Sequence, residues 1–431
     1  MLNNKLPYIS LFSGGGIGDV GFKEAGLYPI LFNELEDYRA QIVQSNFPNS
    51  RVIQGDIKEK TDEIKAVTNE YLANNNIKEL FLISATPPCQ GMSKNGIGTI
   101  LKAMRDGKRP KIDERNSLFL HSIELVNRLK PRYFFFENVD RMLNTYYVDE
   151  NEERILMVDY FVNKMNSIGY TGKFNIVNFA DYGLPQNRRR LVGVFSRNDL
   201  GIDVERLFPA PTHSAEPSLF QERHITLREA IGHLPELDSI SEQSAQSNYH
   251  PLHRTSVSRP DLYYWISHTA EGDTAFNNNK CPKCGSVSDK ETIYCTNCSE
   301  LLPKPVVEKE GELRLIRGFI SAYKRMVYDE PAPTITTRSA YAGSDNNIHP
   351  EQNRVLSIYE VAILQGLDPD SFKWGPIRKQ KRGKEVIEEI GSTTLLRDIL
   401  GEPVSPIFSK KVAEHLKKLD LTFAKTKVLT K

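Results

Sequence analysis

At 431 residues the chain is long for one compact unit, and its length favours two or three domains. Hydrophobic residues make up 39% and charged residues 26%, so the chain can bury a sizeable core, and its net charge of +1 identifies no class of partner. The first residues do not have the pattern of a signal peptide, and no stretch approaches the roughly eighteen apolar residues of a membrane span. We therefore expect a cytoplasmic protein without a membrane partner.

Short apolar runs alternate with helical patterns through residues 1–195. Strands are expected at Tyr8–Phe12, Ile30–Asn33, Leu80–Ser84, Tyr133–Phe136 and Leu191–Phe195, with helices at Asp19–Ala25 and Leu118–Leu129. Strands that are apolar on both faces and alternate with helices indicate a parallel sheet covered on both sides. Residues 1–195 are therefore predicted to form a doubly wound, Rossmann-like α/β domain.

The sequence changes in character after Phe195. Residues 196–350 are rich in Pro, His, Ser and Asn and lack clear periodicity, which indicates a second, smaller, loop-rich domain. Helical spacing returns at Lys410–Leu419, a segment that could pack back on the sheet. We therefore divide the chain at 1–195, 196–350 and 351–431, where the last range ends the second domain and returns to the first.

A glycine-rich segment, Phe12–Gly18, follows the first predicted strand and opens the first predicted helix. Its glycines allow a tight turn and the close approach of a ligand. The spacing is not the GxGxxG of dinucleotide-binding proteins, because Asp19 stands where the third glycine would fall. Considered without its neighbours, this loop could also be a glycine-rich turn that binds no ligand. Glu34, placed to reach ribose hydroxyls, and Asp56, placed to accept from an adenine amino group, favour a nucleoside site.

The single unpaired thiol, Cys89, follows the predicted strand Leu80–Ser84, and Glu137 directly follows the next one, Tyr133–Phe136. Ligands of open α/β sheets bind at the carboxyl ends of the strands. A buried cysteine is usually only a small apolar side chain, but burying a carboxylate without a partner costs several kcal/mol. A thiol and a carboxylic acid at one sheet edge therefore predict covalent catalysis with acid assistance.

Short motifs follow one another over nearly the whole chain: Phe12–Gly18, Pro88–Gln90, Glu137–Val139, Gln186–Arg190, Arg354–Glu360 with Leu364–Gly366, and Leu400–Pro406. In this order they resemble the motifs of the cytosine-5 DNA methyltransferase family. The resemblance implies a prokaryotic enzyme of the restriction-modification type that binds S-adenosylmethionine and double-stranded DNA. Such an enzyme methylates C5 of a cytosine that it has flipped out of the duplex.

The resemblance also implies a role for each residue at the sheet edge. Cys89, as a thiolate, would attack C6 of the cytosine and make C5 nucleophilic. Glu137 would protonate N3 or donate a hydrogen bond to it, and Arg188 and Arg190 would hold the ring oxygen and the region of the nucleophile. A free thiol is only a few per cent ionised at neutral pH, so the site must activate Cys89. No side chain is identifiable as the base that removes the C5 proton.

The expected cofactor site combines the glycine loop with the acidic strand ends. Its residues are Phe12, Ser13, Gly14, Gly16, Gly18, Glu34, Asp56, Ile57 and Pro88. The chain departs from the family pattern at Ser357, which is often threonine, at Glu402, often asparagine, and at Leu35, commonly an aromatic residue that stacks on adenine. The last two departures concern contacts of the cofactor and leave the expected reaction unchanged.

Two stretches are strongly basic. The first, Lys94–Arg115, directly follows Cys89 and is expected to close over the DNA, where its charges would bind phosphates in a salt-dependent way. The second, Arg378–Lys384, is interpreted as a solvated charged face.

Cys281, Cys284, Cys295 and Cys298 have the spacing C-x2-C-x10-C-x2-C, which indicates one tetrahedral structural zinc. Four protein ligands leave no open position for catalysis. This module, at about residues 280–303, lies between Arg190 and Arg354, where the family keeps its target-recognition domain; it either touches DNA or only braces that domain. Candidates for target-strand contacts in the same segment are Arg325, Thr334, Thr336, Thr337 and Arg338.

Three alternative functions remain open. A transfer-RNA cytosine methyltransferase would carry the same motifs, but the long segment between Arg190 and Arg354 favours a reader of duplex DNA. A catalytically silent DNA-binding protein on this scaffold is disfavoured by the intact Cys89, Glu137 and Arg190. A nicotinamide dehydrogenase would need another glycine spacing. The expected protein is a monomer, and a cognate restriction endonuclease is expected to act on the same DNA site.

Overall fold

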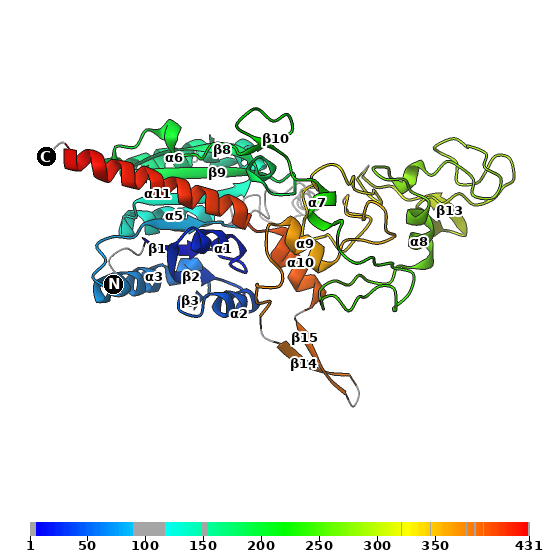
Figure 1. Cartoon of the computed structure of the whole chain (residues 1–431), viewed down its shortest axis with the longest axis horizontal. Coiled ribbons are helices and arrows are strands. Elements are labelled where there is room, and N and C mark those ends of the chain that lie inside the picture. Colours follow the sequence, from blue (N-terminus) through cyan, green and yellow to red (C-terminus); the bar gives the residue numbers. More distant parts are fainter. Residues whose placement is uncertain are drawn as a thin grey trace.

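The computed structural model describes residues 6–88, 117–148, 154–319, 321–344, 346–375, 377–382, 385–390 and 392–429. Within these ranges the largest feature is a seven-stranded sheet with the strand order β3-β2-β1-β4-β5-β9-β8 (Figure 1). Its strands are β1 (Leu6–Leu11), β2 (Leu27–Glu34), β3 (Arg51–Gln54), β4 (Leu82–Ala85), β5 (Tyr133–Val139), β8 (Tyr170–Asn178) and β9 (Arg189–Arg197). The fold is therefore mixed α/β, built on one large central sheet.

Strands β1 to β5 pair in parallel, as the apolar runs predict. The prediction of a fully parallel sheet is wrong at the run Leu191–Phe195, because β9 is antiparallel to both β5 and β8. The connection between β8 and β9 contains only the short helix η3 (Phe179–Tyr182), and a connection of this length cannot carry the chain back across the sheet for a parallel pairing.

Helices cover both faces of the sheet, and the run of phenylalanines in β5 shows how. Phe134 and Phe136 pack on one side, whereas Phe135 packs on the other, as expected from the alternation of side chains along a strand. The first face is covered by α3 (Ile57–Asn74), α5 (Leu118–Leu129) and α6 (Met157–Ser167), and the second by α1 (Ile17–Glu24) and α11 (Pro406–Leu429). Helix α2 (Asp37–Asn46) lies at the β2–β3 end. No helix in the described ranges is both long and apolar enough to span a membrane.

The C-terminal helix α11 returns to the central sheet, as the spacing of Lys410–Leu419 predicts. The ring of Phe408 stacks on Phe179 with centroids 4.7 Å apart and packs against Phe135. The helix also packs closely on α1, where a side chain on Gly21 would collide with the carbonyl of Pro406. The end of the chain therefore holds the helix that follows the glycine loop.

Between β9 and α11 the described chain forms mostly turns and short elements, which Figure 1 shows as a second lobe beside the sheet. These elements are β10 (His213–Ser214), β11 (Glu222–Arg223), α7 (Leu227–Ile231), α8 (Pro260–Ser267), β12 (Val306–Lys309), β13 (Glu312–Leu315), α9 (Ile358–Leu364) and α10 (Thr393–Gly401). The remaining short elements are β6 (Tyr146–Val148), β7 (Arg154–Leu156), η2 (Asp140–Asn144), η4 (Asn198–Leu200), η5 (Val204–Arg206) and η6 (Ala275–Asn277). A second hydrophobic cluster joins residues of this lobe, among them Leu227, Met326 and Leu364, to Ile17 of α1 and Ile42 of α2.

The second basic stretch lies in a hairpin of β14 (Ile377–Arg382) and β15 (Glu385–Ile390), which projects from the molecule (Figure 1). Its register places basic residues opposite acidic ones: Arg378 opposite Glu389, Lys379 opposite Glu388, and Arg382 opposite Glu385. The register therefore sets acidic residues of β15 opposite basic residues of β14, so the hairpin as a whole carries both charges.

Candidate active site

The glycine loop is held over the end of β2 by the carboxylate of Glu34. The amide of Gly14 donates to Glu34 Oε2 over 2.7 Å, and the amide of Glu36 donates to Oε1 over 3.0 Å. The loop backbone adopts positive φ at Phe12 (56°), Gly14 (54°) and Gly16 (72°). A Cβ on Gly14 would meet nothing within 4 Å, so the loop is open on that side. The structure thus brings together the loop and the carboxylate that the sequence predicts.

Glu34 is 6% exposed, and burial raises the pKa of its carboxyl. The amides of Glu36 and Gly14 and the charge of Arg39 act in the opposite direction. The next residue, Leu35, is 55% exposed. The strand end therefore presents an acidic group and an apolar surface next to each other.

Asp56 and Ile57 begin α3. Asp56 is the N-cap of this helix, and its Oδ1 accepts from the amide of Lys58 over 3.0 Å. Ile57 is buried. Pro88 is exposed and ends its described segment. Cys89 and the basic stretch Lys94–Arg115 lie outside the described residues.

Glu137 lies near the end of β5 and forms an ion pair with Arg190 at the start of β9. Arg190 Nε lies 3.1 Å from Glu137 Oε1, and the register that pairs Val139 with Arg190 sets the two side chains at the same edge. Glu137 is 5% exposed, and burial raises the pKa of its carboxyl, while Arg190 and then Arg188 lower it. Burial has the larger effect, so this carboxyl holds a proton to higher pH than an exposed glutamate.

Arg188 lies close enough to Glu137 to lower the pKa of its carboxyl. The side chain is fully buried; Nη1 donates to the carbonyl of Ile335 over 3.1 Å and Nη2 to that of Gly401 over 3.0 Å. Arg188 thereby connects the beginning of β9 with the backbone at Ile335 in the second lobe and with the end of α10.

Asn138, to which the sequence analysis gave no role, positions the segment that precedes Cys89. Its side chain is buried, and Nδ2 donates to the carbonyl of Pro87 over 3.1 Å. From the other side, Thr86 Oγ1 donates to the carbonyl of Phe12 over 3.0 Å. The Pro-Pro turn is thus tied both to β5 and to the glycine loop. The only sequence signal was the place of Asn138 next to Glu137 in one motif.

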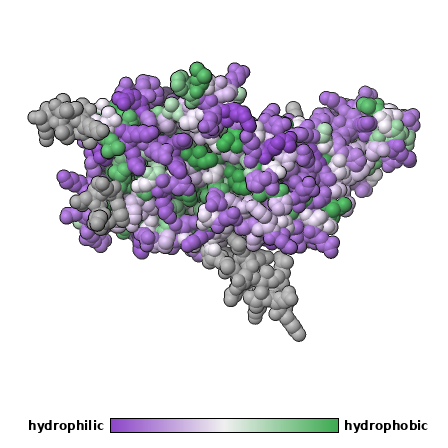
Figure 2. Space-filling view, viewed as in Figure 1, coloured by the Kyte–Doolittle hydropathy of each residue, from purple (hydrophilic) through white to green (hydrophobic). Residues whose placement is uncertain are grey.

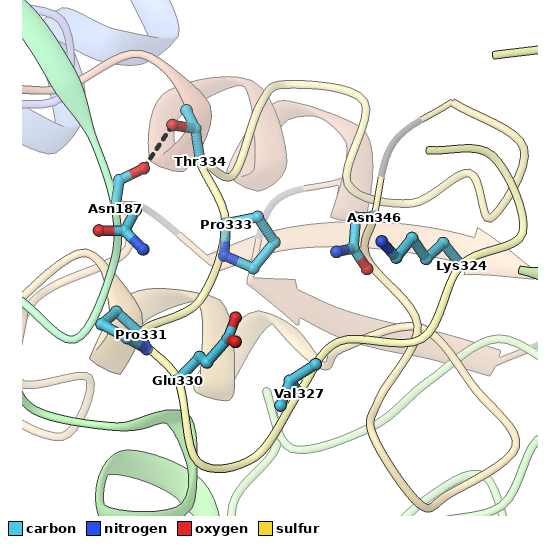
Figure 3. A pocket seen from close by; sticks show the side chains of 8 residues that line it. All are labelled: Asn187, Lys324, Val327, Glu330, Pro331, Pro333, Thr334 and Asn346. Atoms are coloured by element: carbon cyan, nitrogen blue, oxygen red, sulfur yellow. Dashed lines mark hydrogen bonds between the residues drawn. The ribbon is translucent and has the colours of Figure 1, made fainter. Parts of the chain in front are cut away.

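A cleft of about 330 Å³ lies between the start of β9 and the second lobe (Figure 3). Asn187 forms one wall, and its carbonyl accepts from Thr334 Oγ1 over 2.6 Å. Lys324 and Asn346 lie on the opposite side, next to each other (Figure 3). The cleft therefore opens one residue away from Arg188.

The prediction that Arg325 contacts the target strand is wrong. Its guanidinium is 3% exposed and donates to main-chain carbonyls inside the second lobe, among them those of Thr269, Ile266 and Gln352 at 2.7–2.8 Å. Burial lowers the pKa of Arg325 to about 10. The residue holds loops together, because a buried guanidinium needs several acceptors and these carbonyls supply them.

The four cysteines converge, with all their sulfur atoms within 4.8 Å of one another. The Sγ atoms of Cys281 and Cys298 are 3.6 Å apart, and those of Cys284 and Cys295 are 3.5 Å apart. Each CxxC pair is closed by a similar turn, in which the amide four residues after the first cysteine donates to its carbonyl. Four thiols at such distances fit one tetrahedral zinc ion.

Comparison with known proteins gives one consistent result. The sequence model of the family described as C-5 cytosine-specific DNA methylase matches residues 6–393. Type II methyltransferase M1.HgaI of Avibacterium volantium is 28% identical over 427 residues, covering 95% of this chain and 97% of that protein. Type II methyltransferase M1.HphI of Haemophilus parahaemolyticus is 27% identical over 416 residues, covering 96% of this chain and 87% of that protein.

A solved structure has the same fold. It is described as a DNA modification methyltransferase encoded within a prophage of E. coli, and it is similar to this chain with a TM-score of 0.58. The two sequences are 19% identical, and the similarity covers 97% of this chain and 100% of that one.

Proposed function

The chain belongs to the family of C-5 cytosine-specific DNA methylases and is an enzyme of that class; from this premise we propose how its residues carry out the reaction. Cys89 adds as a thiolate to C6 of a flipped-out cytosine, and electron density moves toward N3 of the ring. S-adenosylmethionine, when bound, supplies the electrophilic methyl group that C5 takes up. Loss of the C5 proton then allows elimination of Cys89 and restores the aromatic ring.

The observation that carries this proposal is the buried carboxyl of Glu137 beside Arg190. Because burial raises its pKa, Glu137 holds a proton to higher pH than an exposed glutamate and can donate it to N3 as negative charge develops there. The ion pair at 3.1 Å orients the carboxyl and stabilises the carboxylate that remains after the transfer. Arg190 is also proposed to donate to the carbonyl oxygen O2 of the cytosine.

Arg188 acts in this scheme as a positioning residue. Its hydrogen bonds to the carbonyls of Ile335 and Gly401 hold the start of β9, and therefore Arg190, in place. Asn138 has a similar part on the other side, since its hydrogen bond to Pro87 places the turn that leads to Cys89.

The cofactor is proposed to bind at the glycine loop. Both oxygens of Glu34 already accept a backbone amide, and each retains a lone pair for a ribose hydroxyl. Leu35 offers an apolar surface for the adenine ring, and Asp56 has a second carboxylate oxygen for the adenine amino group. The remaining contacts are assigned to Phe12, Ser13, Gly14, Gly16, Gly18, Ile57 and Pro88.

We assign the second lobe, residues 196–350 with the beginning of 351–431, to recognition of the DNA target. Cys281, Cys284, Cys295 and Cys298 would hold a structural zinc, whose binding energy folds residues of about 280–303. Lys94–Arg115 is proposed to close over the DNA. Two relatives are named type II methyltransferases, and on that basis we propose that a restriction endonuclease for the same site accompanies the enzyme. The enzyme is further proposed to act as a monomer in the cytoplasm.

The test is methyl transfer from labelled S-adenosylmethionine to duplex DNA, with transfer RNA as the competing substrate. We expect label in the duplex, at C5 of cytosine in one sequence, and none in transfer RNA. Label only in transfer RNA would overturn the assignment of the substrate. Replacement of Cys89 by alanine should abolish transfer and leave specific DNA binding intact, because binding depends on other residues.

A further inference from the structure

Two exposed aromatic side chains lie on neighbouring turns of the second lobe. Phe319 is 77% exposed and Tyr341 is 62% exposed. The amide of Tyr323 donates to the carbonyl of Ala342 over 2.7 Å and holds the two turns side by side. We refer to residues 317–319 with 321–324, and 338–344, as the paired turns. Both side chains are therefore accessible to a binding partner.

The paired turns are basic as well as aromatic. They contain Arg317, Lys324 and Arg338 and no acidic residue. None of these three cations forms an ion pair with another described residue. Unpaired cations around exposed aromatic rings are suited to nucleic acid, where cations bind phosphates and apolar groups contact base edges.

The paired turns also lie beside the candidate active site. Lys324 lines the same cleft as Asn187, as Figure 3 shows. Asn187 immediately precedes Arg188 and is three residues from Arg190, the partner of Glu137. A duplex that places a cytosine at Glu137 would therefore extend across the paired turns.

The four-cysteine module is connected to the paired turns through helix α8. Asn278, at the start of the module, donates through Nδ2 to the carbonyls of Trp265 and Pro303 over 2.9 and 2.6 Å. The Trp265 ring in turn packs edge-on against Tyr323, with centroids 5.6 Å apart. Thr274 Oγ1 adds a hydrogen bond of 2.8 Å to the carbonyl of Ala322. The module is thus connected to the paired turns by buried contacts.

The loop between the two CxxC pairs is itself held from inside. Lys304 is fully buried, and its Nζ donates to the carbonyls of Asp289, Lys290 and Thr292 over 2.8–3.1 Å. The module is therefore a rigid unit, suited to act as a brace.

We propose that the paired turns read the DNA sequence: Phe319 and Tyr341 contact base edges in the major groove, and Arg317, Lys324 and Arg338 bind phosphates. The four-cysteine module braces the turns and does not itself contact DNA. This inference rests on the proposed function, because it names the residues through which the methyltransferase selects its duplex.

The test compares alanine variants of exposed side chains in the full chain. The methylated sequence is first identified by bisulfite sequencing of DNA from a host that expresses the wild type. Phe319→Ala and Tyr341→Ala are then compared with two module variants, Val287→Ala and Tyr294→Ala, whose native side chains are 73% and 48% exposed. Phe220→Ala serves as a further control; Phe220 is 94% exposed on the loop between β10 and β11, where Figure 2 shows apolar side chains protruding.

For Phe319→Ala and Tyr341→Ala we expect a fall in kcat/KM for the cognate duplex of about tenfold or more, or methylation of additional sequences. The KM for S-adenosylmethionine and the melting temperature should not change, because both side chains are exposed. Wild-type rates and specificity in both variants would overturn the proposal. An equal loss in Val287→Ala or Tyr294→Ala would show that the module reads DNA and is not only a brace. A wild-type protein that methylates no duplex would refute the proposed function instead.

Discussion

Arg190 Nε lies 3.1 Å from Oε1 of Glu137, and this contact joins the beginning of strand β9 to the end of strand β5. The pairing is possible because β9 runs antiparallel to β5, which brings the beginning of one strand to the end of the other. Burial raises the pKa of Glu137 and Arg190 lowers it, so the arginine decides over which pH range the carboxyl is protonated.

The first prediction follows from this balance. Catalysis needs protonated Glu137, so the single-turnover rate should fall as pH rises through the pKa of this carboxyl. Arg190 lowers the pKa of Glu137, so this pKa should be higher in Arg190→Gln. The descending limb of the pH–rate profile should therefore move to higher pH. The control is Glu137→Gln, in which this limb should be absent and the rate about 10²–10⁴-fold lower. A descending limb at the same pH in Arg190→Gln and the wild type would contradict the assignment of Glu137 as the proton donor.

The second prediction concerns the cofactor. Glu34→Gln should weaken binding of S-adenosylmethionine by roughly tenfold or more, because a charged partner of the ribose hydroxyls and an anchor of Gly14 is lost. Isothermal titration calorimetry measures this change, and affinity for DNA should stay the same. Glu36→Gln is a matched control, since this neighbouring side chain is exposed. Equal affinities for the cofactor in Glu34→Gln and the wild type would remove Glu34 from the site.

The third prediction concerns Asp19, which follows the glycine loop in α1 and is 5% exposed. Burial raises its pKa to about 7, although hydrogen bonds from Ser10 and Tyr8 act against the change. The folded chain therefore binds a proton that the unfolded chain releases near pH 4, so the contribution of Asp19 to stability falls as pH rises from about 4 to about 7. Asp19→Asn should be more stable than the wild type by up to a few kcal/mol at pH 8, and similar to it at pH 4.

Urea unfolding at the two pH values measures this difference. A gain in stability that is the same at pH 4 and pH 8 would show that the amide acts through packing and that the ionisation of Asp19 has no part in it.

Much of the fold and of the site could be predicted from local sequence. The phenylalanines Phe134–Phe136 are apolar on both faces of a strand and indicate a covered sheet, and four cysteines at fixed spacing converge as expected. Features that depend on distant segments could not be predicted. Arg325 was expected to contact DNA, but it donates to carbonyls of residues that are distant in the sequence. The direction of β9 depends on the short connection that precedes it. The structural role of Asn138 depends on the position of Pro87, which is also distant in the sequence.

The fourth prediction concerns the metal. The purified chain should hold one zinc ion, and Cys284→Ser should lose it and disorder residues of about 280–303. Affinity for S-adenosylmethionine should not change, because the glycine loop and Glu34 make no contact with the module. Methylation of DNA should fall about tenfold or more as the paired turns lose their brace. The control is Lys283→Ala, which changes the residue next to Cys284 and should retain zinc. Elemental analysis that finds no zinc in the wild type would refute this part of the account.

The most direct measurement of the central claim is capture of the covalent intermediate. A duplex that carries 5-fluorocytosine at the methylated position is incubated with the protein and S-adenosylmethionine, and the adduct is mapped by mass spectrometry of its peptides. Fluorine cannot leave as the C5 proton does, so the enzyme should remain bound through Cys89 to a methylated base. The same duplex should form no adduct with Cys89→Ala. An active wild type that gives no adduct, or an adduct on any other residue, would contradict the mechanism.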